Sequence, residues 1–144
     1  MRVEDQTVLA LCMWRENRGH GVEGMQSVAN VIVNRAARWK STVYWECVRP
    51  LQFSSMTAKN DPELSLWPRE TDAEWAQALE LAAQAAAGTL EDITDGALYY
   101  YAPRSIKTTK AIEWLDGTTV PFPESWDAQV VKPLCAIGGQ LFFR

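Results

Sequence analysis

The sequence predicts a mainly helical domain with a small β element, an α+β fold. Three observations lead to this prediction. Apolar residues recur every three to four positions in two stretches before residue 40, a helix-capping sequence stands at Thr71–Glu74, and strand-forming residues gather at 96–102 and 135–143. The 144 residues contain no internal repeat, low-complexity tract or linker. We therefore expect a single domain, residues 1–144.

The first two predicted helices occupy the N-terminal part of the chain. The first covers residues 7–17, where apolar side chains share one face, and Gly19 stands where this helix would end. After a turn through Gly21, the second helix runs to near Arg38. Its apolar stripe is typical of a helix that faces a core.

The rest of the chain is predicted to be less regular. Residues 40–68 contain prolines and scattered aromatic residues without sustained periodicity, which favours a long irregular segment with short strands or turns. A third helix is predicted from the capping box at Thr71–Glu74 to Gly88. A short strand in 96–102 and an extended segment in 135–143 follow, with mostly loop between them.

Charge and hydropathy exclude two classes of partner. The chain has 18 acidic and 14 basic residues, a net charge of -4 and no run of lysine or arginine. A nucleic-acid partner is not expected, because phosphate neutralisation supplies most of the affinity for nucleic acids. No signal peptide and no apolar run long enough to span a bilayer are recognised, so we expect synthesis in the cytoplasm and no stable membrane anchor.

The histidine and cysteine counts argue against a metal site. His20 is the only histidine, which excludes sites built on two imidazoles, and its place in a glycine turn favours a solvated residue over a catalytic one. Cys12, Cys47 and Cys135 are widely spaced and odd in number, so free thiols are expected. We expect neither a metal ion nor a cofactor.

Glu16 is the candidate general acid. It stands at the end of the first predicted helix among apolar neighbours, and both burial and the helix dipole would raise the pKa of its carboxyl. Glycoside cleavage requires a general acid that is still protonated near neutral pH. The alternative is an ordinary glutamate paired with Arg15 or Arg18. Aromatic residues in the irregular segments are compatible with a sugar-binding groove and equally with packing.

Four segments carry a resemblance to a known family. Residues 14–35 read WRENRGHGVEGMQSVANVIVNR, residues 51–54 read LQFS, residues 96–100 read GALYY and residues 137–143 read IGGQLFF. In this order they resemble the opening signature, the Gln-Phe-Ser element, the Gly-Ala-x-x-Tyr segment and the closing Ile-Gly-x-His-x-Phe-Tyr of the SleB-type cell-wall hydrolases. The likeness spans nearly the whole chain.

The resemblance implies a lysozyme-like fold and cleavage of peptidoglycan between N-acetylmuramic acid and N-acetylglucosamine. Glu16 matches the family's catalytic glutamate. The family is generally described as lytic transglycosylases, in which one acid protonates the glycosidic oxygen and then, as a base, helps the muramyl C6 hydroxyl close a 1,6-anhydro ring. A hydrolytic muramidase stays open, with Glu23, Asp61, Asp72 or Asp95 as a base that activates water.

The resemblance also implies six substrate-binding residues: Gln52, Phe53, Ser54, Tyr100, Trp126 and Gln140. Tyr100 is expected near the cleaved bond, with buried packing as the alternative. Trp126 resembles a family tryptophan across a longer spacing. Two positions depart from the pattern, because His20 replaces the family's second glutamate and Gln140 replaces its closing histidine, although Gln140 keeps a hydrogen-bond donor.

The expected biological role is that of a phage endolysin. Spore cortex members of the family carry a signal peptide and a peptidoglycan-binding repeat domain, and neither is recognised in this sequence. We expect a monomer that reaches peptidoglycan in the periplasm after release by a holin-type pore protein. A bacterial wall-remodelling enzyme is the second interpretation, an inactive glycan-binding module is the alternative of another class, and a peptidase or amidase is a weaker third.

Overall fold

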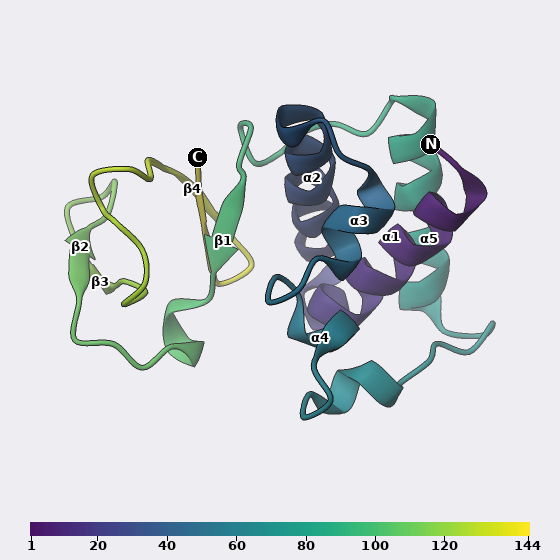
Figure 1. Cartoon of the computed structure of the whole chain (residues 1–144), viewed down its shortest axis with the longest axis horizontal. Helices are drawn as coiled ribbons and strands as arrows, with labels where there is room; N and C mark the ends of the chain where they lie inside the picture. Colours follow the sequence, from purple (N-terminus) through teal and green to yellow (C-terminus); the bar gives the residue numbers. More distant parts are fainter.

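The computed structural model describes residues 1–144 and consists of a helical part and a β part (Figure 1). Three long helices build the helical part: α1 (Val3–Asn17), α2 (Gly21–Trp39) and α5 (Ala73–Ala87). α1 packs against both of the others, and its Leu9 and Met13 are fully buried. The predicted α+β fold class is confirmed.

The apolar periodicity predicted that the first helix begins at residue 7, but α1 begins at Val3. The Asp5 carboxylate accounts for the difference. It accepts the backbone N–H of Arg2 at 2.9 Å and that of Tyr44 at 2.8 Å. Acidic side chains are favourable in a first helical turn because they face the positive end of the helix dipole. This polar first turn carries no apolar pattern, so the periodicity does not detect it.

α2 follows its prediction closely. Met25, Val28 and Ile32 are fully buried on one face. The helix ends where Lys40 adopts a left-handed conformation with φ 53°.

The segment 40–68 contains short helices where short strands or turns were predicted. They are α3 (Val43–Val48), α4 (Ser54–Thr57) and the 3-10 helix η2 (Pro62–Ser65). α3 is capped by the Thr42 hydroxyl, which accepts the backbone N–H of Trp45 at 3.0 Å. Helices of one turn or two are too short to show a hydrophobic period, so sequence periodicity could not identify them.

The predicted capping box before α5 does not form. The helix starts one residue later, with Asp72 at the N-cap, and the Asp72 carboxylate accepts the backbone N–H of Arg69 at 2.8 Å. The carboxylate thus closes the turn before the helix instead of capping the first helical N–H groups. Gly88 ends α5 in a left-handed conformation with φ 73°, as its position in the sequence predicts.

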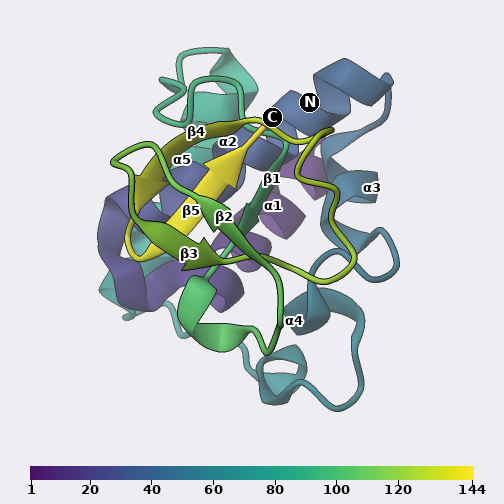
Figure 2. The same cartoon turned by 90° about the vertical axis from the view of Figure 1, so that its left-hand side faces the viewer.

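Two small antiparallel sheets form the β part (Figure 2). The first has the order β1-β5-β4 and joins β1 (Tyr99–Tyr101), β5 (Gln140–Phe143) and β4 (Pro133–Ile137), in agreement with the two predicted extended segments. The second pairs β2 (Ala111–Glu113) with β3 (Thr119–Pro121), where the sequence predicted loop. The remaining elements are two 3-10 turns, η1 (Arg18–His20) and η3 (Pro103–Ser105).

Aromatic packing joins the first sheet to the helices. Phe142 of β5 is fully buried in a cluster with Val31 of α2 and Ala97. The ring of Tyr100 stacks on that of Phe142 with a centroid distance of 5.4 Å. Figure 2 shows the β part lying over one side of the helical part. The stacking fixes Tyr100 of β1 against the helices.

Two further sequence expectations concern cysteines and membrane segments. Cys12 and Cys47 are buried, Cys135 is half-buried, and all are free, as predicted. None of the helices has the combined length and apolar character that crossing a membrane requires.

Candidate active site

Glu16 lies in the last turn of α1 and is held by two hydroxyl groups. Ser55 of α4 donates its hydroxyl to Oε2 at 2.6 Å, and Tyr100 of β1 donates its hydroxyl to Oε1 at 3.1 Å. Three separate elements therefore meet at one half-buried carboxyl group.

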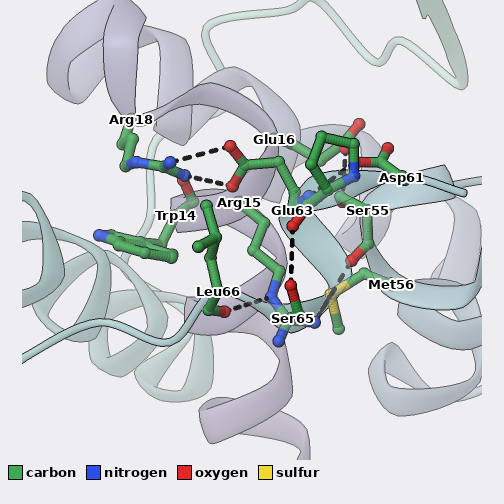
Figure 3. Close-up of polar contacts among 11 residues, drawn as sticks. Trp14, Arg15, Glu16, Arg18, Ser55, Met56, Asp61, Glu63, Ser65 and Leu66 are labelled. Carbon is green, nitrogen blue, oxygen red and sulfur yellow. Dashed lines mark hydrogen bonds and ion pairs between the residues drawn. The ribbon is translucent and has the colours of Figure 1, made fainter. Parts of the chain in front are cut away.

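Neither neighbouring arginine pairs with Glu16, which removes the ordinary interpretation of a helix-end ion pair. Arg18 instead binds both carboxylate oxygens of Glu63, at 2.6 and 2.9 Å (Figure 3). Arg15 donates to the backbone oxygens of Leu66 at 3.1 Å and Ser55 at 3.3 Å. Arg15 thereby fixes the backbone of the residue whose hydroxyl reaches Glu16.

The surroundings of Glu16 favour its protonated form. Burial raises the pKa of its carboxyl, and the negative charges of Asp61 and Glu63 add to the increase. The hydrogen bonds from Ser55 and Tyr100 act in the opposite direction, because a donor stabilises the ionised form, but the net shift of the pKa is upward. The direction agrees with the expectation from the sequence.

Tyr100 is a neutral donor to this carboxyl group. Burial and the neighbouring charge of Glu16 raise the pKa of its phenol well above the usual range. Tyr100 therefore keeps its proton, and its hydroxyl can stabilise the Glu16 carboxylate once the acid has given up its own proton.

Two hollows share Glu16, Leu51 and Gln52 in their lining, and together we call them the groove. We call the first the aromatic hollow. Its volume is about 340 Å³ and its lining residues are Glu16, Arg35, Leu51, Gln52, Phe53, Tyr99, Tyr100 and Trp126. The second, the α4 hollow, has a volume of about 540 Å³ and is lined by Glu16, Pro50, Leu51, Gln52, Ser54, Thr57 and Ala58. A carboxyl group at the junction of two hollows can act on a bond within an extended chain.

Most of the sequence-predicted substrate residues line this groove. Gln52 is exposed and borders both hollows, and Tyr100 lies beside Glu16. Trp126 borders the aromatic hollow and meets Tyr99 edge-on, with ring centroids 5.7 Å apart. Phe53 also borders that hollow, but it is 2% exposed and belongs mainly to the helical core.

Ser54 and Ser55 divide their roles in a way that the sequence did not reveal. Ser54 borders the α4 hollow, but its hydroxyl donates to Asp61 at 2.5 Å. The neighbouring Ser55, which was not predicted, is the one that reaches Glu16. Only the turn geometry of α4 decides which of two adjacent serines faces the carboxyl group.

Gln140 is not brought to the groove. It is buried below the end of α1, where its amide oxygen accepts from Asn17 at 2.8 Å and its amide nitrogen donates to Asn17 at 3.2 Å. His20 is exposed and packs against Gly138 in the turn between β4 and β5. Both positions that depart from the family pattern therefore lie outside the lining of the two hollows.

Among the acids predicted as a possible second catalytic carboxylate, Asp61 is the one whose charge acts on Glu16. Its charge contributes to the raised pKa of Glu16. Its own oxygens accept the Ser54 hydroxyl and the backbone N–H of Glu63. Asp72, by contrast, is the N-cap of α5, and Asp95 lies in the turn before β1.

Arg35 also borders the site, although it was not predicted as a site residue. In the sequence it was noted only as the last residue of the opening signature. It stands on the buried stripe of α2, one turn after Ile32, and borders the aromatic hollow. A charged residue on an otherwise apolar stripe was a signal available in the sequence.

Comparisons with known proteins bear on the fold and the family of this chain. No protein with curated annotation matches the chain in sequence. In structure, the chain is similar to the catalytic domain of the germination-specific lytic transglycosylase SleB from Bacillus anthracis, with a TM-score of 0.68 and 23% identity over 100% of this chain and 97% of that one. The expected fold is thereby confirmed. A family model described as cell wall hydrolase matches residues 19–142, and the chain belongs to the cell wall hydrolase family.

Proposed function

We propose that this protein cleaves the glycosidic bond between N-acetylmuramic acid and N-acetylglucosamine in peptidoglycan, with Glu16 as the general acid. The observation that carries the proposal is the position of Glu16, a carboxyl group of raised pKa at the junction of two hollows. Family membership supports the substrate, and the name of the structurally similar SleB domain supports the bond. The match to the family begins at residue 19, so the role of Glu16 depends on its surroundings and on the resemblance of its motif.

Burial and hydrogen bonding have opposite effects on the pKa of Glu16, which suits an acid that must later act as a base. Burial favours the protonated acid before cleavage, and the hydroxyls of Ser55 and Tyr100 stabilise the carboxylate after the proton has left. Each oxygen of Glu16 accepts one of these hydroxyls, so the carboxyl proton is free to point to a substrate oxygen in the groove.

We further propose a lytic transglycosylase mechanism. Glu16 gives its proton to the glycosidic oxygen, the C1–O bond breaks, and the N-acetylglucosamine chain leaves with a hydroxyl end. The Glu16 carboxylate then takes the proton of the muramyl C6 hydroxyl while that oxygen bonds to C1, which closes the 1,6-anhydro ring. One carboxyl group is sufficient for this sequence. Asp61, the nearby alternative, already accepts two hydrogen bonds from the protein.

The decisive experiment is mass spectrometry of the fragments released from purified peptidoglycan. We expect the unmodified protein to release muropeptides lighter by one water than hydrolytic products, and Glu16→Gln to release none. Release is expected to persist in EDTA. Asp61→Asn distinguishes the alternative, because hydrated reducing ends that disappear in this variant would establish a muramidase with Asp61 as its base. Folded protein that releases nothing would instead favour a glycan-binding module.

We propose the role of a phage endolysin, acting as a monomer on periplasmic peptidoglycan after release by a pore-forming protein. Its support is the activity class, because host lysis requires cleavage of the wall, and a site assembled within one chain. Expression in a Gram-negative host with and without a holin tests the role. Lysis that needs both the holin and Glu16 supports it. Cells that stay intact by turbidity with the holin present contradict it and favour a wall-remodelling enzyme.

A further inference from the structure

Arg35 is a buried cation at the edge of the aromatic hollow. It is 5% exposed and lies in the C-terminal half of α2. Its Nε donates to the backbone oxygen of Leu98 at 2.6 Å, which fixes the guanidinium in place. Its Nη1 is buried and has no hydrogen-bond partner.

No carboxylate forms an ion pair with Arg35. The closest acid in electrostatic terms, Glu46, is bound by Arg49 and by the hydroxyl of Ser41 instead. A buried charge without an ionic partner or a full set of hydrogen bonds is energetically unfavourable, and such groups in native proteins commonly serve a functional purpose.

Aromatic rings compensate the charge only in part. The guanidinium carbon of Arg35 lies 5.7 Å from the ring centre of Trp39, 5.6 Å from that of Phe53 and 5.8 Å from that of Tyr99. A ring face attracts a cation but offers no directional acceptor for an N–H group. Arg35 therefore lacks an acceptor oxygen for its Nη1 group. The hollow that Arg35 borders is also lined by Glu16.

We propose that Arg35 binds a carbonyl or carboxylate oxygen of the sugar that occupies the aromatic hollow. This inference rests on the proposed function. Two groups near the glycosidic bond of peptidoglycan carry such an oxygen: the acetamido group, present on both sugars, and the lactyl group, present only on the muramyl sugar. Either would form a charge-assisted hydrogen bond with the guanidinium, while its apolar atoms contact the aromatic rings of the hollow. Arg35 then fixes the register of the glycan relative to Glu16.

Calorimetric titration in the Glu16→Gln background tests this, because binding is measured without cleavage. The probes are peptide-free muramyl tetrasaccharide, which carries both groups, and chitotetraose, which has only acetamido groups. Arg35→Lys keeps the charge and loses the planar fork. We expect it to weaken binding of the muramyl tetrasaccharide roughly tenfold to a hundredfold. Arg38→Lys, an exposed change on the same helix, is the matched control and should bind unchanged.

The two probes separate the two sources of oxygen. An equal loss of affinity for chitotetraose assigns the acetamido carbonyl, and retained affinity for chitotetraose assigns the lactyl oxygen. Unchanged affinity of Arg35→Lys for both sugars, with thermal unfolding like that of the parent, overturns the inference. If the lysine variant does not fold, Arg35→Gln, which removes the charge together with the planar fork, is titrated in its place.

Cleavage assays distinguish failure of this inference from failure of the proposed function. With Glu16 intact, Arg35→Lys is expected to raise KM for peptidoglycan, because a binding contact is lost. Unchanged KM and kcat in this variant, together with an inactive Glu16→Gln, would remove the role of Arg35 and leave the proposed function intact. Absence of cleavage by the unmodified protein would remove the proposed function itself, together with the inference that rests on it.

Discussion

The hydroxyl of Tyr100 lies 3.1 Å from Oε1 of Glu16, which joins β1 directly to the end of α1. The Tyr100 ring is held by stacking on Phe142, so the position of this donor depends on how the sheet packs against the helices. The β part is thus not an appendage to a helical enzyme. It supplies one of the two hydroxyl groups that donate hydrogen bonds to Glu16.

Replacing Tyr100 by Phe should change the pH dependence of cleavage. The hydrogen bond from Tyr100 lowers the pKa of Glu16, so its removal raises that pKa further. Activity requires protonated Glu16 and is lost as pH rises through its pKa, so the alkaline limb of the pH profile should move to higher pH. The rate at the optimum should fall roughly tenfold to a hundredfold, because the carboxylate formed on proton transfer loses a donor.

The measurement is kcat/KM for peptidoglycan across the pH range. Tyr44→Phe removes a hydroxyl from an exposed tyrosine and serves as the matched control. An alkaline limb that stays in place in Tyr100→Phe would show that the hydroxyl does not act on Glu16 in the working enzyme.

Two adjacent serines allow a second, internally controlled prediction. Ser55→Ala removes the donor 2.6 Å from Oε2 of Glu16, whereas Ser54→Ala removes a donor to Asp61. For a transglycosylase that uses Glu16 alone, Ser55→Ala should reduce kcat roughly tenfold or more, and Ser54→Ala should have a much smaller effect. The measurement is the rate of muropeptide release. The reverse order of effects would point to Asp61 and to a hydrolytic mechanism.

The features of the fold that depend on local sequence pattern could be predicted from the sequence. The apolar stripe of α2, the stop at Gly88 and the extended segments of β1 and β5 follow from residue spacing and residue type. The direction of the pKa shift of Glu16 was also predictable, because apolar residues precede it in the first helix and burial is the largest cause of the increase.

The missed features depend on contacts between residues far apart in the chain. Ser55 and Glu16 lie 39 positions apart, and only the conformation of the intervening segment brings them together. Gln140 and Asn17 lie 123 positions apart, so the sequence could not show that the amide of Gln140 is already occupied. The β2–β3 hairpin consists of strands of three residues each, which carry too little pattern to recognise.

Gln140 is expected to contribute to stability rather than to binding. Its amide makes both of its hydrogen bonds with Asn17, the residue that follows Glu16, so Gln140→Ala leaves a buried amide partly unpaired. The free energy of unfolding should fall by about 1–3 kcal/mol. Urea unfolding measures this change, with the exposed Gln129→Ala as control. A raised KM without a loss of stability would instead assign Gln140 to the glycan, as the family resemblance implied.

Glu16 itself should destabilise the fold when it is ionised. Its native pKa is raised above that of an unfolded carboxyl group, about 4.3. The native state therefore holds this proton more tightly than the unfolded state, and the associated stability is present below the unfolded pKa and lost as pH rises through the native pKa.

Glu16→Gln cannot ionise and escapes this loss. Its Tm should match that of the parent at pH 4 and exceed it at pH 8 by roughly 3 °C for each 1 kcal/mol of burial cost. Calorimetry across this range measures the difference, and Glu113→Gln, an exposed change, controls for the loss of one negative charge. A glutamine variant less stable than the parent at pH 8 would mean that Ser55 and Tyr100 stabilise the carboxylate by more than burial costs it, and Glu16 would then lack the raised pKa that a general acid requires.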